Sequence, residues 1–148
     1  MAAEKPRAVI CDLDGTLCNV AHREHFMRVR PKQREEFHSA CVNDEIVKPV
    51  QELLSIFRST GYRIVFLTMR PARFRPQTEA WLAAHGVAYD ELLMAADTRP
   101  DAEQKRSMYE EFLHPRYDVR FVIDDRASVV AMWREMGLMV LDVAGADF

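Results

Sequence analysis

The sequence has 148 residues, of which 49% are hydrophobic and 29% are charged, and its net charge is -3 at pH 7. This length and composition favour one folded domain over a disordered chain, and the negative net charge argues against a protein that coats nucleic acid with its whole surface. The longest apolar runs are far shorter than the roughly 20 residues of a membrane helix, and the first residues lack the apolar stretch of a signal peptide.

Glycine and cysteine usage excludes several classes of site. The five glycines stand in neither the GxGxxG nor the GxxxxGK[ST] spacing that cradles nucleotide phosphates, which excludes dinucleotide-binding dehydrogenases and P-loop kinases. The three cysteines, Cys11, Cys18 and Cys41, are an odd number in a short chain without an export signal, so we expect reduced thiols. These features predict a soluble, cytoplasmic protein.

Strand-length apolar runs alternate with helical patterns along the chain. The predicted strands are residues 8–11, 63–68, 92–94, 119–123 and 138–141. The predicted helices are residues 49–60, 76–85 and 127–136, and a glycine follows each of them. Continuous apolar strands between helices indicate a parallel sheet covered on both faces, so we expect a three-layer, doubly wound α/β fold of the Rossmannoid type.

Residues 19–48 interrupt this alternation and are too long for an ordinary connection. They are predicted to be a functional loop or a small cap inserted after the first strand of a single domain that spans residues 1–148. The insert carries a run of basic residues, Arg23, Arg28, Arg30, Lys32 and Arg34. Its second half, about residues 33–42, is predicted to form a helix that buries Phe37 and Cys41.

Polar side chains follow the predicted strands at the points where the strands end. Asp12-Leu13-Asp14-Gly15-Thr16 follows the first strand, Thr68-Met69-Arg70 the second, and Asp124-Asp125 the fourth. A predicted helix before the fourth strand carries Asp101 and Lys105, one turn apart. Because the carboxyl ends of parallel strands meet at one edge of a sheet, four carboxylates, a hydroxyl and a lysine should converge there.

Carboxylates gathered in this way repel one another unless a cation neutralises them. An all-oxygen cluster suits Mg²⁺ better than zinc, so we expect magnesium as the cofactor. Residues two apart in an extended segment point the same way, so Asp12 and Asp14 should face one ligand while Gly15 lets the chain turn.

The same motifs resemble those of the haloacid dehalogenase (HAD) superfamily of phosphohydrolases. The DxDGT motif matches residues 12–16, the strand that ends in Thr or Ser matches residues 66–68, and Lys105 and Asp124-Asp125 match the remaining two motifs. Further similarity to the phosphatase domains of bacteriophage polynucleotide kinase/3′-phosphatases lies in residues 97–105, 121–126, 130–134 and 145–148. The resemblance is weakest in the insert.

This resemblance implies a Mg²⁺-dependent phosphomonoesterase that works through an aspartyl-phosphate and removes 3′-phosphate from polynucleotide ends. It makes Asp12 the nucleophile, makes Asp14 the acid and base, and assigns Thr68 and Lys105 to the clamp around the transferring phosphoryl group. The magnesium ligands that it implies are Asp12, the backbone carbonyl of Asp14, Asp124 and, directly or through water, Asp125.

Other residues receive supporting roles. The resemblance implies that Asp101 orients Lys105 and that Arg70 contacts the substrate phosphate, and Thr16 is assigned to substrate binding with it. The basic run of the insert, Arg23, Arg28, Arg30, Lys32 and Arg34, is predicted to grip a nucleic-acid backbone, and Arg28 and Arg30 are assigned to substrate binding. The kinase part of the bifunctional enzymes has no counterpart in this sequence, so we expect no 5′-kinase activity and leave open a separate kinase partner.

Several alternatives remain at this point. The enzyme alternative is a 5′-nucleotidase or another small-molecule phosphatase. A signalling receiver domain is disfavoured because its lysine follows the last strand and no acid pair comes after it, and a non-catalytic phosphate-binding module ranks last because no motif residue is missing. The insert also offers a zinc alternative, built from Cys18, His22, His25, His38 and Cys41. DNA or RNA specificity and oligomeric state are left open.

Overall fold

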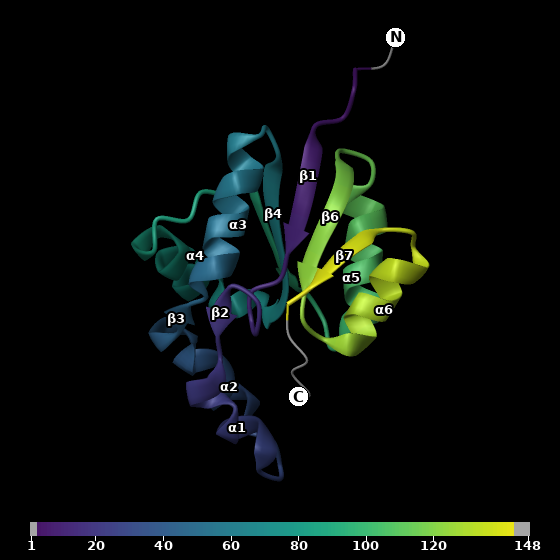
Figure 1. Cartoon of the computed structure of the whole chain (residues 1–148). Helices are drawn as coiled ribbons and strands as arrows, with labels where there is room; N and C mark the ends of the chain where they lie inside the picture. The colour runs from purple at the N-terminus through teal and green to yellow at the C-terminus, as the bar shows by residue number, and fades with distance from the viewer. Residues whose placement is uncertain (1–2, 144–148) are drawn as a thin grey trace.

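A five-stranded sheet forms the centre of the computed structural model, which describes residues 3–143 (Figure 1). The strands stand in the order β5-β4-β1-β6-β7, and every neighbouring pair is parallel. Their bounds are β1 (Arg7–Cys11), β4 (Arg63–Pro71), β5 (Glu91–Ala95), β6 (Asp118–Asp124) and β7 (Met139–Asp142). All five predicted strands occur, although β4 continues beyond Thr68. Residues 145–148, which carried part of the resemblance, lie outside the described residues.

Helices cover both faces of this sheet, as predicted (Figure 1). One face is covered by α3 (Lys48–Ser59) and α4 (Arg75–Ala84), which a short turn, η3 (Ala72–Phe74), precedes. The other face is covered by α5 (Asp101–Met108), the π-helical turn η4 (Tyr109–Leu113) and α6 (Ala127–Glu135). None of the helices in residues 3–143 is both long enough and apolar enough to cross a bilayer.

The alternation of side chains along β1 divides the core into two clusters. Val9 and Cys11 face one cluster, whose helical side chains are Val50, Leu54, Trp81 and Leu82. Ala8 and Ile10 face the other, whose helical side chains include Val129, Val130 and Trp133. A strand that is apolar on both sides must be covered on both sides, which is the physical reason for the three layers.

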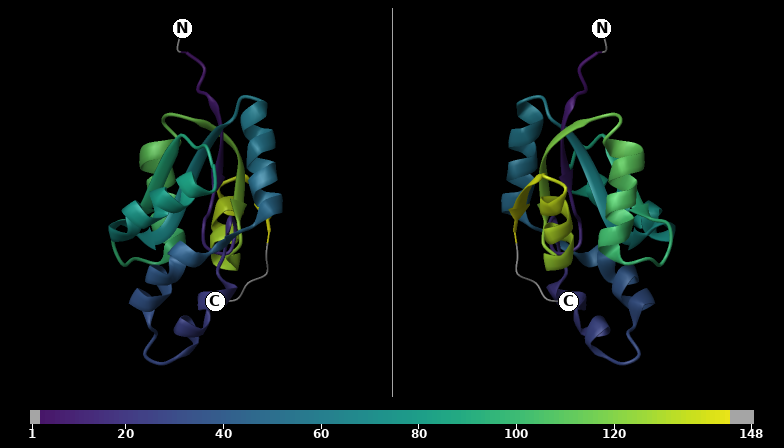
Figure 2. Two further views of the ribbon diagram at one scale, coloured as in Figure 1. Left: turned by 90° about the vertical axis from the view of Figure 1, so that its left-hand side faces the viewer. Right: turned by 90° about the vertical axis from the view of Figure 1, so that its right-hand side faces the viewer.

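The insert lies beyond the carboxyl ends of the strands, where both views of Figure 2 show it below the sheet. It begins and ends in a small antiparallel sheet of β2 (Cys18–Asn19) and β3 (Glu45–Ile46). Between them lie η1 (Ala21–Arg23), α1 (His25–Arg28), α2 (Arg34–Ser39) and η2 (Ala40–Asn43). The predicted helix over residues 33–42 is therefore a short α-helix followed by a 3₁₀ turn, and it buries Phe37 and Cys41 as expected.

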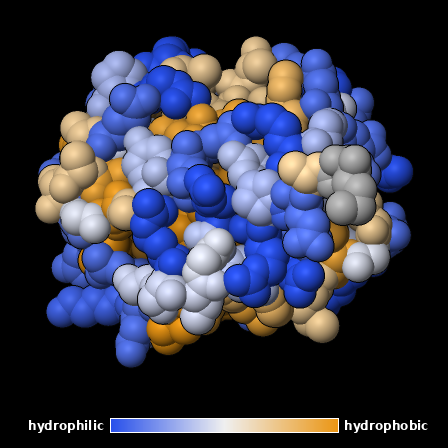
Figure 3. Space-filling model, turned by 90° about the horizontal axis from the view of Figure 1, so that it is seen from above, coloured by the Kyte–Doolittle hydropathy of each residue, from blue (hydrophilic) through white to orange (hydrophobic). Residues whose placement is uncertain are grey.

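The register of β1, β4 and β6 places the motif residues at the same height along the strands, at the carboxyl edge of the sheet. Cys11 pairs with Phe66 of β4 and with Ile123 of β6, and the N–H of Asp12 donates to the carbonyl of Ile123 at 3.0 Å. The residues that follow these positions consequently emerge together at the carboxyl edge. Figure 3 views the opposite end of the molecule, where hydrophilic residues predominate.

The packing of α3 against the sheet predicts different stability effects for substitutions on its buried and exposed sides. Leu54 is 4% exposed within the first core cluster, whereas Ile56 on the same helix is 54% exposed. We expect Leu54→Ala to lower the free energy of unfolding by about 2–5 kcal/mol because it leaves a cavity, and Ile56→Ala to change it by less than about 0.5 kcal/mol. Urea denaturation of both variants checks this, and equal losses would contradict the assigned packing.

Candidate active site

The loop between β1 and β2 is held by its own backbone. Leu13 is fully buried in the core, so Asp12 and Asp14 on either side of it turn toward the edge of the sheet. Gly15 has φ +81°, a conformation that residues with a Cβ atom rarely adopt. The N–H groups of Gly15 and Thr16 donate to the carbonyls of Cys18 and Leu13 at 2.9 and 3.0 Å.

The carboxyl ends of β1, β4 and β6 open into a cavity of about 590 Å³, which the insert and residues 97–101 complete. All candidate site residues except Thr16, Arg28 and Arg30 line this cavity: Asp12, Asp14, Thr68, Arg70, Asp101, Lys105, Asp124 and Asp125. The edge of the sheet therefore assembles residues from four separate segments of the chain.

Three carboxylates cluster at the base of the cavity. Oxygen atoms of Asp12, Asp124 and Asp125 lie within 4.8 Å of one another, and each residue is less than 10% exposed. The Nζ atom of Lys105 lies 3.2 Å from Asp12 Oδ1 and 2.9 Å from Asp124 Oδ2. Burial raises the pKa of Asp12 well above its usual range, against the attraction of Lys105, and the nearby charge of Asp124 adds to the rise.

The cluster also fits a magnesium ion. The Oδ2 atom of Asp125 is buried and has no hydrogen-bond partner among residues 3–143. Burial raises the pKa of this carboxyl as well, and the charge of Asp124 contributes. An unpartnered oxygen in an all-carboxylate group suits a small divalent cation that prefers oxygen ligands.

Trp133 and Asp125 fix the orientation of Asp124. The indole Nε1 of Trp133 donates to Asp124 Oδ2 at 3.3 Å, and the backbone N–H of Asp125 donates to Asp124 Oδ1 at 2.9 Å. Trp133 is fully buried, as expected for a core residue, but this hydrogen bond was not foreseen from the sequence. Its helical spacing indicates only that it faces the core.

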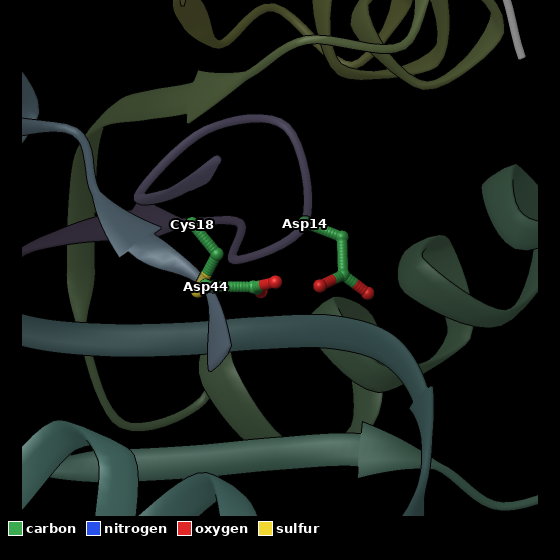
Figure 4. A group of neighbouring side chains, drawn as sticks. All are labelled: Asp14, Cys18 and Asp44. Atoms are coloured by element: carbon green, nitrogen blue, oxygen red, sulfur yellow. The ribbon is translucent and has the colours of Figure 1, made fainter. Parts of the chain in front are cut away.

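A second group of acids lies between the first strand and the insert. Figure 4 shows Asp14 and Asp44 with their carboxylates turned toward each other and Cys18 beside Asp44. Arg23 spans the gap, because its Nη2 lies 2.6 Å from Asp14 Oδ1 and 2.7 Å from Asp44 Oδ2. Arg70 Nη2 also lies 2.6 Å from Asp14 Oδ1. Two guanidinium groups thus neutralise these acids in place of a metal.

These ion pairs set the protonation of the group. Burial would raise the pKa of Asp14, but the charges of Arg70 and Arg23 lower it below its usual range. Burial raises the pKa of the Cys18 thiol well above its usual value, so no thiolate is available there.

Arg70 is a buried residue rather than a solvated surface arginine, since it is 1% exposed. Its Nη1 donates to Thr78 Oγ1 at 2.9 Å, and its backbone N–H donates to Thr68 Oγ1 at 3.1 Å. The expected phosphate ligand is therefore already anchored beside Asp14.

Two of the expected roles differ from the observed contacts. Asp101 does not pair with Lys105; it forms an ion pair with Arg126, while Asp12 and Asp124 orient the lysine. The Thr16 hydroxyl donates to Asp125 Oδ1 at 3.3 Å and does not line the cavity. Thr16 is thus placed to position Asp125.

The insert does not assemble the zinc site considered above. His22 Nε2 lies 2.6 Å from Asp44 Oδ1, and the His25 ring lies against Phe26 with the two centroids 4.0 Å apart. Among the residues that the structure describes, no candidate metal group contains a histidine. His38 is the histidine that lines the cavity, and burial lowers its pKa to about 4, so it is neutral at pH 7.

Arg23 and Asp44 are the site residues that sequence reasoning missed. Arg23 looks like one member of a solvated basic run, yet it is fully buried. Its partner Asp44 is distant in sequence, so no local spacing links the two. The one available signal is that Asp44 stands at the end of the insert, next to the strand that closes it.

A family comparison agrees with this arrangement. Residues 6–148 match the family model described as the polynucleotide kinase PNKP phosphatase domain. The chain belongs to this family. It is therefore a HAD-type phosphatase domain, a phosphoric monoester hydrolase by class, and the receiver-domain and non-catalytic alternatives are excluded.

Solved and curated relatives show how this PNKP-type phosphatase domain compares with longer proteins. A chain in the structure of the Pnkp1/Rnl/Hen1 complex is 35% identical with a TM-score of 0.86, over 99% of this chain and 49% of that one. A "putative bifunctional polynucleotide kinase/RNA ligase" of Autographa californica nuclear polyhedrosis virus is 28% identical over 138 residues, 88% of this chain and 18% of its own length. The chain thus spans less than half of these relatives.

A class C acid phosphatase from Bacillus anthracis shares the fold at 14% identity and a TM-score of 0.73, over 99% of this chain and 69% of that one.

The buried ion pairs of Asp44 lead to a stability prediction. Asp44→Asn leaves the Arg23 guanidinium without its full counter-charge, and we expect the free energy of unfolding to fall by about 3–5 kcal/mol. The neighbouring Glu45→Gln removes the same charge from an exposed position and should change it by less than about 0.5 kcal/mol. Chemical denaturation checks both predictions. An unchanged free energy of unfolding in Asp44→Asn would contradict the assigned role of Asp44.

Proposed function

We propose that this domain is a Mg²⁺-dependent phosphomonoesterase that removes 3′-phosphate from polynucleotide ends through an aspartyl-phosphate on Asp12. The observation that carries the chemistry is the meeting of Asp12, Thr68, Lys105 and the acid pair at the base of one cavity. Membership of the polynucleotide kinase phosphatase family supports the polynucleotide as substrate.

In the first step a carboxylate oxygen of Asp12 attacks phosphorus, and the bond from phosphorus to the leaving oxygen breaks. Negative charge spreads over the other phosphoryl oxygens, where the Lys105 ammonium and the Thr68 hydroxyl stabilise it. Lys105 lies within 3.2 Å of Asp12, so it serves the nucleophile and the transferring group from one position.

Asp14 is proposed to protonate the leaving oxygen and then to take a proton from the water that hydrolyses the aspartyl-phosphate. Its contacts with Arg23 and Arg70 favour the ionised carboxylate, which is the form that the second step uses. The first step uses the protonated form, so it requires the substrate phosphate to compete with Asp14 for Arg70, the one of the two arginines that lines the cavity.

Magnesium would be held by the carboxylates of Asp12 and Asp124 and the backbone carbonyl of Asp14, with Asp125 bound directly or through water. When bound, the ion neutralises the carboxylate cluster and the charge that develops on the phosphoryl oxygens. Asp124 is kept in place for this by Trp133 and Lys105.

We also propose that phosphate removal here is one step of nucleic-acid end processing. The support is that one relative carries the name polynucleotide kinase/RNA ligase and another occurs in the Pnkp1/Rnl/Hen1 complex. The cytoplasmic location stays a prediction.

Phosphate release from three substrates tested side by side decides among the phosphatase alternatives. The substrates are a 3′-phosphorylated oligonucleotide, the matching 5′-phosphorylated oligonucleotide and free mononucleotides. We expect the highest kcat/KM for the 3′-phosphorylated oligonucleotide. A preference for mononucleotides would favour the 5′-nucleotidase or small-molecule alternative.

Replacement of the nucleophile gives the sharpest test of the covalent mechanism. Asp12→Asn should retain less than a tenth of the wild-type turnover, because a neutral amide cannot attack phosphorus, and should keep the fold because it removes a repelling charge. Steady-state kinetics and thermal unfolding check the two effects, with Asp118→Asn outside the cavity as control. Turnover by Asp12→Asn above a tenth of the wild-type rate would contradict the covalent mechanism.

Magnesium binding predicts a stability effect in addition to activity. Because the ion binds the folded carboxylate cluster, added Mg²⁺ should raise the Tm of the wild-type protein and raise that of Asp125→Asn less. Chelation should abolish turnover, and calcium should support it poorly because its larger shell misplaces the reacting groups. Full activity after exhaustive chelation, or an equal rise in Tm for both proteins, is the contrary result.

A further inference from the structure

Two cations on the wall of the cavity have no carboxylate partner among the residues that the structure describes. Among the basic side chains that line it, Arg70, Arg99, Lys105 and Arg126 each form an ion pair with an acid. Lys32 and Arg34 also line it, and within residues 3–143 they make no side-chain hydrogen bond or ion pair. Unpaired positive charge on the wall of a cavity attracts an anion.

The other basic residues of the insert are engaged elsewhere. Arg23 is buried between Asp14 and Asp44. Arg28 pairs with Glu24 at 2.8 Å, and Arg30 donates to the carbonyls of Met27 and Val29 at 3.1 Å. Neither Arg28 nor Arg30 lines the cavity, so their predicted contact with a nucleic-acid backbone would have to lie outside it.

The cavity has more room than the reacting phosphate needs. Its volume of about 590 Å³ lies within the range of about 300–1,000 Å³ that holds ligands of drug size. The lining includes the catalytic groups and, from the insert, the apolar side chains Met27 and Phe37 besides Lys32 and Arg34. The carboxylate cluster with Lys105 would take one phosphate, the apolar side chains would contact a sugar and base, and the two unpaired cations would bind a second phosphate. This combination suits a nucleoside that carries two phosphates.

We infer that Lys32 and Arg34 form a second phosphate subsite, which binds the 5′-phosphate of the terminal nucleotide while its 3′-phosphate lies at Asp12. The sugar and base then lie against Met27 and Phe37. In a polynucleotide this phosphate is the phosphodiester group nearest the 3′ end. The subsite would therefore favour a nucleic-acid strand over a substrate that carries a single phosphate. The inference rests on the proposed 3′-phosphatase function and defines its smallest complete ligand as a nucleoside 3′,5′-bisphosphate.

A matched pair of double variants tests this subsite. One variant carries Lys32→Gln and Arg34→Gln, and the control carries Arg28→Gln and Arg30→Gln, so both lose the same charge from the same insert. The substrates are a 3′-phosphorylated single-stranded oligonucleotide, thymidine 3′,5′-bisphosphate, thymidine 3′-monophosphate and p-nitrophenyl phosphate. Equal thermal unfolding curves establish that both variants are folded.

We expect the Lys32/Arg34 variant to raise KM about tenfold or more for the oligonucleotide and the bisphosphate, with kcat nearly unchanged. KM for the monophosphate and for p-nitrophenyl phosphate should change less than twofold, and the control variant should resemble the wild type. The salt dependence of log KM for the oligonucleotide should become shallower by about 0.7 for each lost contact.

Other results would overturn the inference in distinguishable ways. Equal changes in KM for all four substrates, or equal changes caused by the control variant, would mean that the insert acts only through its overall positive charge and not through a specific phosphate contact. An effect on the oligonucleotide without one on the bisphosphate would place the contact farther along the strand. A wild-type protein that releases no phosphate from any 3′-phosphorylated substrate would overturn the proposed function together with the subsite, whereas wild-type activity without a selective loss would overturn the subsite alone.

Discussion

Mutual repulsion among buried carboxylates is the constraint on which this structure depends. Five acids, Asp12, Asp14, Asp44, Asp124 and Asp125, meet at the carboxyl edge of the sheet and face three cations, Arg23, Arg70 and Lys105. A buried charge costs several kcal/mol unless it is paired, so each cation must be held in place by the fold. Burial raises the pKa values of Asp12 and Asp125, and a bound divalent cation would favour the ionised form of both.

This balance joins the insert to the catalytic core. Arg23 comes from the insert and Arg70 from β4, yet both bind Asp14 of the loop after β1. The Trp81 indole also donates to the carbonyl of Asp44 at 3.0 Å, which ties the end of the insert to α4. The insert is thus part of the electrostatics of the site, and its Lys32 and Arg34 line the cavity without an acidic partner among residues 3–143.

Much of the fold and the base of the site could be predicted from local patterns. Apolar runs specify the strands because a parallel sheet is buried on both faces. Asp12 follows β1, Asp124 is the last residue of β6 and Thr68 lies near the end of β4, so all three stand at the carboxyl edge that this pattern predicts. Short-range patterns were less informative about contacts. They placed Asp101 and Lys105 one turn apart, but Arg126 from the start of α6 binds Asp101.

The sequence by itself determined that acids, a hydroxyl and a lysine converge at one edge, because strand order in an α/β sheet places successive strand ends together. Only the tertiary structure decided which basic residues of the insert are buried, which form ion pairs and which line the cavity. Arg23 is buried, Arg28 is paired on the surface, and Lys32 lines the cavity without a partner in the described part of the chain, although all three carry the same charge within one irregular segment. Their environments depend on packing against residues distant in the chain, such as Asp44, and no periodicity within the segment encodes that packing.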